Sequence, residues 1–173
     1  MGKQSSSGNM IRLAERFASS GAFRRLFQEG MGLVEECATY LDGSGRTAAK
    51  TMGRETSLVY GTESMRLTTR LMQLASWLLL QRAANNGEMN RGQLMEERKK
   101  VRLDSLPEPV EGPEWPNLPT DFILLVRRSL ALQKRIRKLD EEIYGRERAP
   151  AGDNPVDQQI NLLSTALGAM RKT

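Results

Sequence analysis

The segment YGTESMRLTTRLMQLASWLLL at residues 60–80 decides the fold class of this 173-residue chain. Its leucines recur every three or four residues, the spacing of one α-helical face: Leu67, Leu71, Leu74 and Leu78. A second apolar stripe runs beside them: Met65, Met72 and Leu79. A helix that is apolar nearly all round is buried on several sides. The pattern therefore predicts a long central helix over about residues 54–85.

Two further long helices are predicted on either side of this one. The first begins after Ser19 or Ser20, and one face carries Phe23, Leu26, Gly30, Leu33, Cys37 and Tyr40. Residues 43–45, Gly-Ser-Gly, are predicted to form the turn after it. The last long helix begins at Thr120 or Asp121 and is expected to end at Gly145. Its stripe keeps a seven-residue repeat: Phe122, Leu125, Ser129, Leu132, Ile136, Leu139 and Ile143.

Residues 104–119 differ in character from the helical segments. They are rich in proline and acidic residues and contain no lysine or arginine. Because proline has no amide hydrogen and restricts the residue before it, regular helix is excluded here. We expect an acidic connector that crosses the bundle surface, with Trp115 as its buried anchor. A short basic helix containing Leu94 is expected before it, after Asn90.

The predicted fold is all-α, an antiparallel three-helix bundle of long helices with a flexible N-terminus and a partly ordered C-terminal segment. Residues 1–18 form the leader and residues 19–146 the bundle. Residues 147–173 form a tail in which Val156, Ile160, Leu163 and Leu167 lie on one side of a short helix. Two interpretations of this tail stay open. It folds on binding a partner, or it docks on the bundle.

Composition excludes several classes of enzyme and metal protein. The sequence contains no histidine and one cysteine, Cys37, so it lacks a residue that catalytic triads, Cys-His pairs and His-ligated metal sites require. A lone cysteine forms no intrachain disulfide, which fits a reducing cytoplasm. The longest apolar run is far shorter than the roughly 20 residues of a membrane span. No cofactor site is predicted, and we expect a protein that is not an enzyme.

The densest polar cluster on the central helix includes Glu63, Arg66, Arg70 and Gln73. Glu63 and Arg66 are three residues apart and Arg66 and Arg70 four, so they share a face. One interpretation is a half-buried ion-pair network that fixes helix register, with Glu35 and Glu36 as partners of the arginines. The other is a partner-binding surface, because arginine makes directional contacts with carboxylates. Catalysis is disfavoured because no nucleophile, base or metal ligand accompanies the cluster.

The net charge of +5 raises the question of nucleic-acid binding. Basic side chains crowd the last long helix: Arg127, Arg128, Lys134, Arg135, Arg137 and Lys138. However, no helix-turn-helix pattern and no interleaved stacking aromatics accompany them. A basic solvated face that is partly neutralised by the acidic connector is the preferred interpretation. A basic helical nucleic-acid-associated regulator is the alternative.

Three strings resemble a known family. They are YGTESMRLTTRLMQLASWLLL at 60–80, EGMGLVEECATYLDGSGR at 29–46, and the pair Gly87-Glu88. Together they resemble the alphaproteobacterial regulator of CtrA degradation (RcdA) family of short all-helical proteins, over about residues 20–145.

The resemblance implies a non-enzymatic adaptor that helps deliver substrates such as the cell-cycle regulator CtrA to the ClpXP protease. It implies a homodimer that acts with the response-regulator-like adaptors CpdR and PopA in the cytoplasm, concentrated at a cell pole. The predicted partner-binding residues are Glu63, Arg66, Arg70, Gln73, Ile160, Leu163 and Leu167. No membrane partner is expected.

Overall fold

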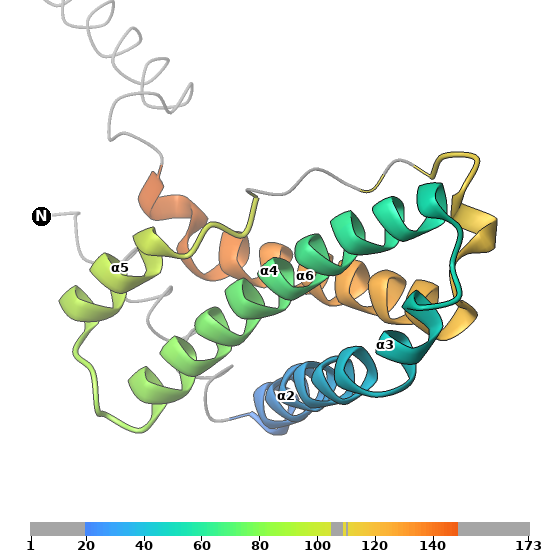
Figure 1. Cartoon of the computed structure of the whole chain (residues 1–173). Coiled ribbons are helices and arrows are strands. Elements are labelled where there is room, and N and C mark those ends of the chain that lie inside the picture. Colours follow the sequence, from blue (N-terminus) through green and yellow to red (C-terminus); the bar gives the residue numbers. More distant parts are fainter. Residues whose placement is uncertain (1–19, 105–108, 110, 149–173) are drawn as a thin grey trace, which may run out of the picture. The chain divides into compact units, whose positions relative to one another are not determined.

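The computed structural model describes residues 20–104, 109 and 111–148, and within them every regular element is a helix. Three helices are long: α2 (Gly21–Asp42), α4 (Arg54–Asn85) and α6 (Thr120–Arg148). Three are short: α3 (Ser44–Ala49), α5 (Arg91–Lys100) and the 3₁₀ helix η1 (Trp115–Asn117). The predicted all-α class is therefore confirmed (Figure 1).

By its internal contacts the chain divides into two units, residues 1–139 and 140–173. The first unit contains α2 to η1 and α6 as far as Leu139. The described residues of the second unit, 140–148, are the last turns of α6, which ends beyond the Gly145 predicted from the sequence. The leader 1–18, and the part of the predicted tail after Arg148, lie outside the described residues.

Helix directions within the first unit follow from the residues that pair between helices. Arg128 and Arg135 of α6 bind Glu36 and Glu29 of α2, both at 2.7 Å, so these two helices run antiparallel. Helix α2 is also antiparallel to α4 (Figure 1). Helices α4 and α6, however, run in the same direction. Two bundle helices that run in the same direction need a long crossover connection, which the connector provides.

The connector returns along α6. Asp104 binds Arg137 at 2.6 Å and Glu111 binds Arg127 at 3.4 Å, so the chain moves back toward the start of α6. At its end Glu114 accepts a hydrogen bond from Thr56 at the start of α4 at 2.7 Å. Trp115 is buried in the core, which confirms the predicted anchor.

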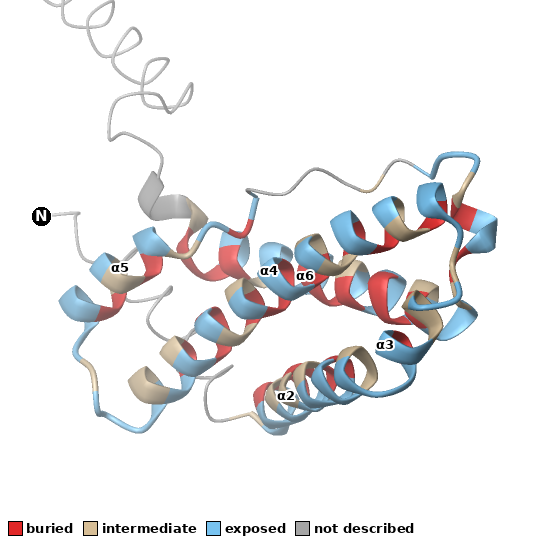
Figure 2. Cartoon of the chain, in the orientation of Figure 1, coloured by how far each residue is buried: buried red, intermediate tan, exposed pale blue. Residues whose placement is uncertain are grey.

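The core of the first unit lies between the three long helices (Figure 2). It includes the predicted stripe of α2 from Phe23 to Cys37, the leucine stripe of α4, and α6 from Phe122 to Ile136. At Gly30 the α2 backbone comes so close to α4 and α6 that a side chain there would meet Leu78 and Leu132. The glycine in the α2 stripe is therefore a packing requirement.

Two predictions about this region were wrong. Residues 44–49 form helix α3, where the sequence predicted a turn at 43–45. Gly45 is buried there against the ring of Tyr40 and the hydroxyl group of Tyr60, which explains a glycine inside a helix. The second apolar stripe of α4, with Met65 and Met72, is exposed where burial was expected. Helices α2 and α6 both pack on the leucine side of α4 and leave the other side uncovered (Figure 2).

Replacing Gly30 tests the close approach of α2. Gly30→Ala places a methyl group against the fully buried Leu78, and we expect a loss of about 1–3 kcal/mol in the free energy of unfolding. Gly32→Ala, with no atom near the added methyl, gains up to about 1 kcal/mol from helix propensity. Urea denaturation of both variants provides the measurement. Equal stability of the two would contradict the packing at Gly30.

Candidate partner-binding surface

The cluster predicted on α4 is largely internal. Glu63 is 4% exposed and Arg70 is 1% exposed. Arg66 is partly exposed and binds the Glu63 carboxylate at 2.7 Å, within one turn of the same helix. Of the predicted partners Glu35 and Glu36, Glu36 is paired instead with Arg128 of α6. The acidic side chains Glu29 and Glu36 of α2 therefore face arginines of α6 and not those of α4.

Arg70 links α4 to α6 inside the bundle. Its Nη1 donates a hydrogen bond to Ser129 Oγ at 2.9 Å, and that hydroxyl donates to the carbonyl oxygen of Val126 at 2.7 Å. Within the part of the chain that the structure describes, the Nε and Nη2 groups of Arg70 have no hydrogen-bond partner. Burial lowers the pKa of Arg70, and the nearby Glu63 carboxylate opposes this effect. A buried guanidinium with so few partners lowers the stability of the fold. The sequence pattern did not show whether Arg70 lies inside the bundle or on its surface.

The remaining predicted residues are placed as follows. Gln73 lies half-buried at a groove between α4 and α5. Ile160, Leu163 and Leu167 lie outside the described residues. Direct contact with a partner is open to Arg66 and Gln73 on α4, whereas Glu63 and Arg70 lie inside the bundle. The partner role of Arg66 and Gln73 stays a prediction.

The exposed side of α4 forms an uncharged surface that the sequence interpretation missed. Its large apolar side chains recur every seven residues: Leu58, Met65, Met72 and Leu79, exposed by 73%, 71%, 66% and 47%. At 1.5 Å per residue this stripe extends for about 30 Å. Small residues flank it: Gly61, Thr62, Thr68, Thr69 and Ser76. We call these nine residues the α4 outer face; no charged residue is among them.

The hydroxyl groups of the outer face are satisfied within α4 itself. Thr62, Thr69 and Ser76 donate to the carbonyl oxygens of the residues four positions earlier, at 2.9, 2.9 and 2.8 Å. Such back-bonding meets the hydrogen-bonding demand of each hydroxyl inside the helix. The surface can therefore be covered by another protein with little loss of hydrogen bonding. Exposed apolar patches of this kind mark interaction sites.

A groove adjoins the outer face between α4 and α5, with a cavity of about 650 Å³. Apolar lining residues are Met72, Leu79, Leu80, Ala83 and Val101. Polar lining residues are Thr69, Gln73, Ser76, Glu97, Lys100 and Arg102. This volume lies within the range of about 300–1,000 Å³ typical of ligand pockets.

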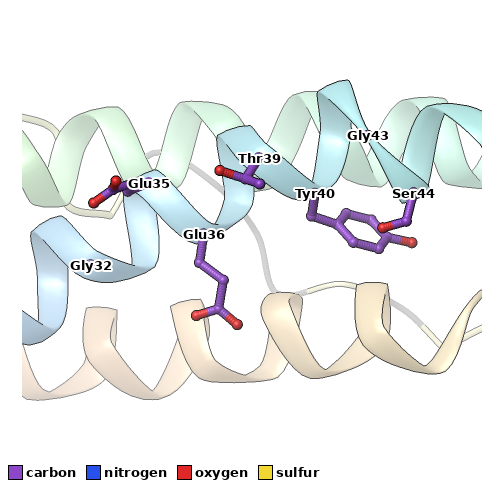
Figure 3. A pocket seen from close by; sticks show the side chains of 7 residues that line it. All are labelled: Gly32, Glu35, Glu36, Thr39, Tyr40, Gly43 and Ser44. Atoms are coloured by element: carbon purple, nitrogen blue, oxygen red, sulfur yellow. The ribbon is translucent and has the colours of Figure 1, made fainter.

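A second depression lies along α2 and the start of α3 (Figure 3). Its lining includes Glu35, Glu36, Tyr40 and Ser44, with the Glu36 side chain directed toward α6. Desolvation, followed by the proximity of Tyr60 and Asp121, raises the pKa of Tyr40 to about 12. The phenol therefore stays protonated at neutral pH and is a poor proton acceptor.

The thiol of Cys37 is likewise unsuited to act as a nucleophile. Cys37 is buried in the core, as predicted, and burial raises the pKa of its thiol, with a smaller contribution from Glu36. The thiol is therefore protonated and unreactive at neutral pH. Among the residues that the structure describes, no group of three or more His, Cys, Asp or Glu side chains can hold a metal ion. No described helix is long and apolar enough to span a bilayer.

The basic face of α6 is paired with acidic side chains. Four arginines bind carboxylates of α2 or the connector: Arg127 with Glu111, Arg128 with Glu36, Arg135 with Glu29 and Arg137 with Asp104. These pairs lower the positive potential that a phosphate backbone would meet. The partial neutralisation by the connector was predicted, and the contribution of α2 was not.

Comparison with known proteins identifies the family. A family model described as "protein of unknown function (DUF1465)" matches residues 14–167. The crystal structure of RcdA from Caulobacter crescentus CB15 is similar, with 42% sequence identity and a TM-score of 0.61. The alignment covers 79% of this chain and 99% of RcdA. The chain belongs to the RcdA family. No curated protein matches it significantly in sequence.

Membership of the RcdA family confirms the resemblance drawn from residues 29–46, 60–80 and 87–88. The family model also extends over most of the C-terminal segment, as far as residue 167.

Removing the hydroxyl that binds Arg70 tests the cost of this buried arginine. Ser129→Ala leaves the guanidinium without its bond to α6, and we expect a loss of about 1–3 kcal/mol in the free energy of unfolding. The variant Arg70→Met, of similar length and apolar, is expected to be neutral or stabilising. Thermal unfolding of both variants is the measurement. A stable Ser129→Ala protein would show that this bond contributes nothing.

Proposed function

We propose that this protein is a non-enzymatic adaptor that helps deliver substrates, CtrA among them, to the ClpXP protease. The single observation that supports this most strongly is its 42% identity to RcdA, aligned over nearly the whole of that chain. The α4 outer face supports the same proposal from the structure. It exposes an extended apolar stripe, and exposed apolar patches of this kind mark interaction sites.

The mechanism requires no chemistry from the adaptor itself. A protein that binds both a client and a protease raises their local concentration, to about millimolar for short linkers. The buried thiol of Cys37 is in keeping with this, since burial keeps it protonated and away from solvent. The three packed helices would act as a rigid support that holds the outer face in a fixed shape.

The finer features come from the family resemblance and are part of the proposal. They are a homodimer, cooperation with CpdR and PopA, and a cytoplasmic location with concentration at a cell pole. The pairing of the α6 arginines with acidic side chains favours this function over the nucleic-acid alternative.

Degradation of a client tests the proposal. Purified ClpXP is incubated with CtrA, CpdR and PopA, with or without this protein, and loss of CtrA is followed by gel. We expect faster loss when the protein is present. Met65→Glu on the α4 outer face should remove most of the acceleration, because it places a charge in an apolar contact.

The matched control is Leu124→Glu, the same kind of change at an exposed leucine of α6. It should leave the acceleration unchanged, and both variants should keep the wild-type melting temperature. No acceleration by the wild-type protein would contradict the adaptor function. An equal loss of acceleration in both variants would show that the α4 outer face has no specific part in delivery.

A further inference from the structure

The groove between α4 and α5 has a defined wall. Helix α5 begins with a capping box, in which Asn90 Oδ1 accepts from the Gln93 amide and Gln93 Oε1 accepts from the Asn90 amide. Its Leu94 and Arg98 are buried. After α5, Gln133 of α6 donates to the Leu103 carbonyl at 2.6 Å. The wall is therefore held at both ends before any partner arrives, which reduces the ordering cost of binding.

The charge of this wall is net positive, and its charged lining residues at the groove are Lys100, Arg102 and one carboxylate, Glu97. Residues 91–102 contain five arginines or lysines and two glutamates. At the groove, Lys100 binds Glu97 at 2.6 Å, but both side chains are largely exposed. Such a surface pair contributes little stability, so Lys100 can exchange Glu97 for a carboxylate of a partner at small cost. Arg102 adds a second cation to the same lining.

The opposite side of the groove is uncharged, and its large apolar side chains repeat along α4. Met72 and Leu79 line the groove and also belong to the α4 outer face, where the spacing of seven residues continues to Met65 and Leu58. Apolar positions at this spacing pack against another helix with the same period. Exposed methionines adapt to different partner side chains.

From these three observations we infer that the α4–α5 groove and the adjoining outer face bind one amphipathic helix of a partner protein. The apolar face of that helix packs on Met72 and Leu79, and an acidic edge lies along Lys100 and Arg102. This is the helix-in-groove mode of recognition. The inference deepens the proposed function and rests on it for the statement that the partner is a delivered protein.

Selection from a peptide library tests the inference without knowledge of the client. The probe is a displayed library of 16-residue peptides with a fixed helical apolar stripe and random residues elsewhere. The intact protein is the bait. We expect the selected peptides to be enriched in Asp and Glu along one edge of the stripe. Fluorescence anisotropy of a selected peptide then gives its Kd.

Variants locate the binding. Met72→Glu with Leu79→Glu should weaken the peptide at least about tenfold, which corresponds to about 1.4 kcal/mol. Lys100→Glu with Arg102→Glu should weaken acidic peptides and select basic ones. Leu124→Glu on α6 is the matched control and should bind like the wild type. Circular dichroism confirms that each variant is folded.

Several results would overturn the inference. They are a library without enrichment, selected peptides without acidic residues, and a wild-type Kd in the Met72→Glu/Leu79→Glu variant. The inference would also be overturned if the Met72→Glu/Leu79→Glu variant changed its oligomeric state and still bound the peptide. That result would assign the surface to contact with a second copy of the chain. The degradation assay is independent. Peptide binding without accelerated degradation would leave the groove assigned and contradict only the adaptor function.

Discussion

The close packing of α2 against α4 and α6 at Gly30 is the contact on which the rest of the bundle depends. Leu78 of α4 occupies the space that a side chain at this position would fill, and Leu132 of α6 lies at van der Waals distance from it. The approach brings the inner faces of the three helices together over Trp77 and the leucines of α4. Because all of this packing lies on one side of α4, the other side keeps its apolar residues exposed.

The parallel course of α4 and α6 sets the role of the connector. Its prolines prevent the connector from forming a regular helix. Its acidic side chains bind arginines of α6, as Asp104 binds Arg137. Together with Glu29 and Glu36 of α2, these contacts neutralise a face that composition alone presented as basic. The lining of the groove is net positive as well, with Lys100, Arg102 and one carboxylate, Glu97.

Much of the fold was predictable from periodicity. The stripes of α2 and α6 are buried where the spacing of their residues indicated, except that Tyr40 and Leu139 are only partly buried. Trp115 is buried as the anchor predicted for the connector. Met65 and Met72 were predicted to be buried, but they are exposed. The prediction failed because periodicity shows which residues share a helix face and not whether a neighbouring element covers that face. Arg70 was equally ambiguous. Only the position of Ser129 on α6 shows that its guanidinium points inward. The groove depends on how α5 sits against α4, which local sequence does not determine.

Helix α4 therefore has two functions in this account. Its inner face holds the core, and its outer face, with the groove beside α5, is available to a partner. A surface with no charged residue would be a liability on a protein that acts alone. It fits the adaptor function proposed above for this member of the RcdA family.

Methyl NMR tests this central claim most directly. The intact protein is labelled with ¹³C at its methionine methyl groups and titrated with unlabelled CtrA. The account predicts shifts or broadening of Met65 and Met72, which are exposed on α4, while Met52, packed against the core, stays unchanged. If CtrA binds, as judged by co-sedimentation, and the signals of Met65 and Met72 do not change, the account is contradicted.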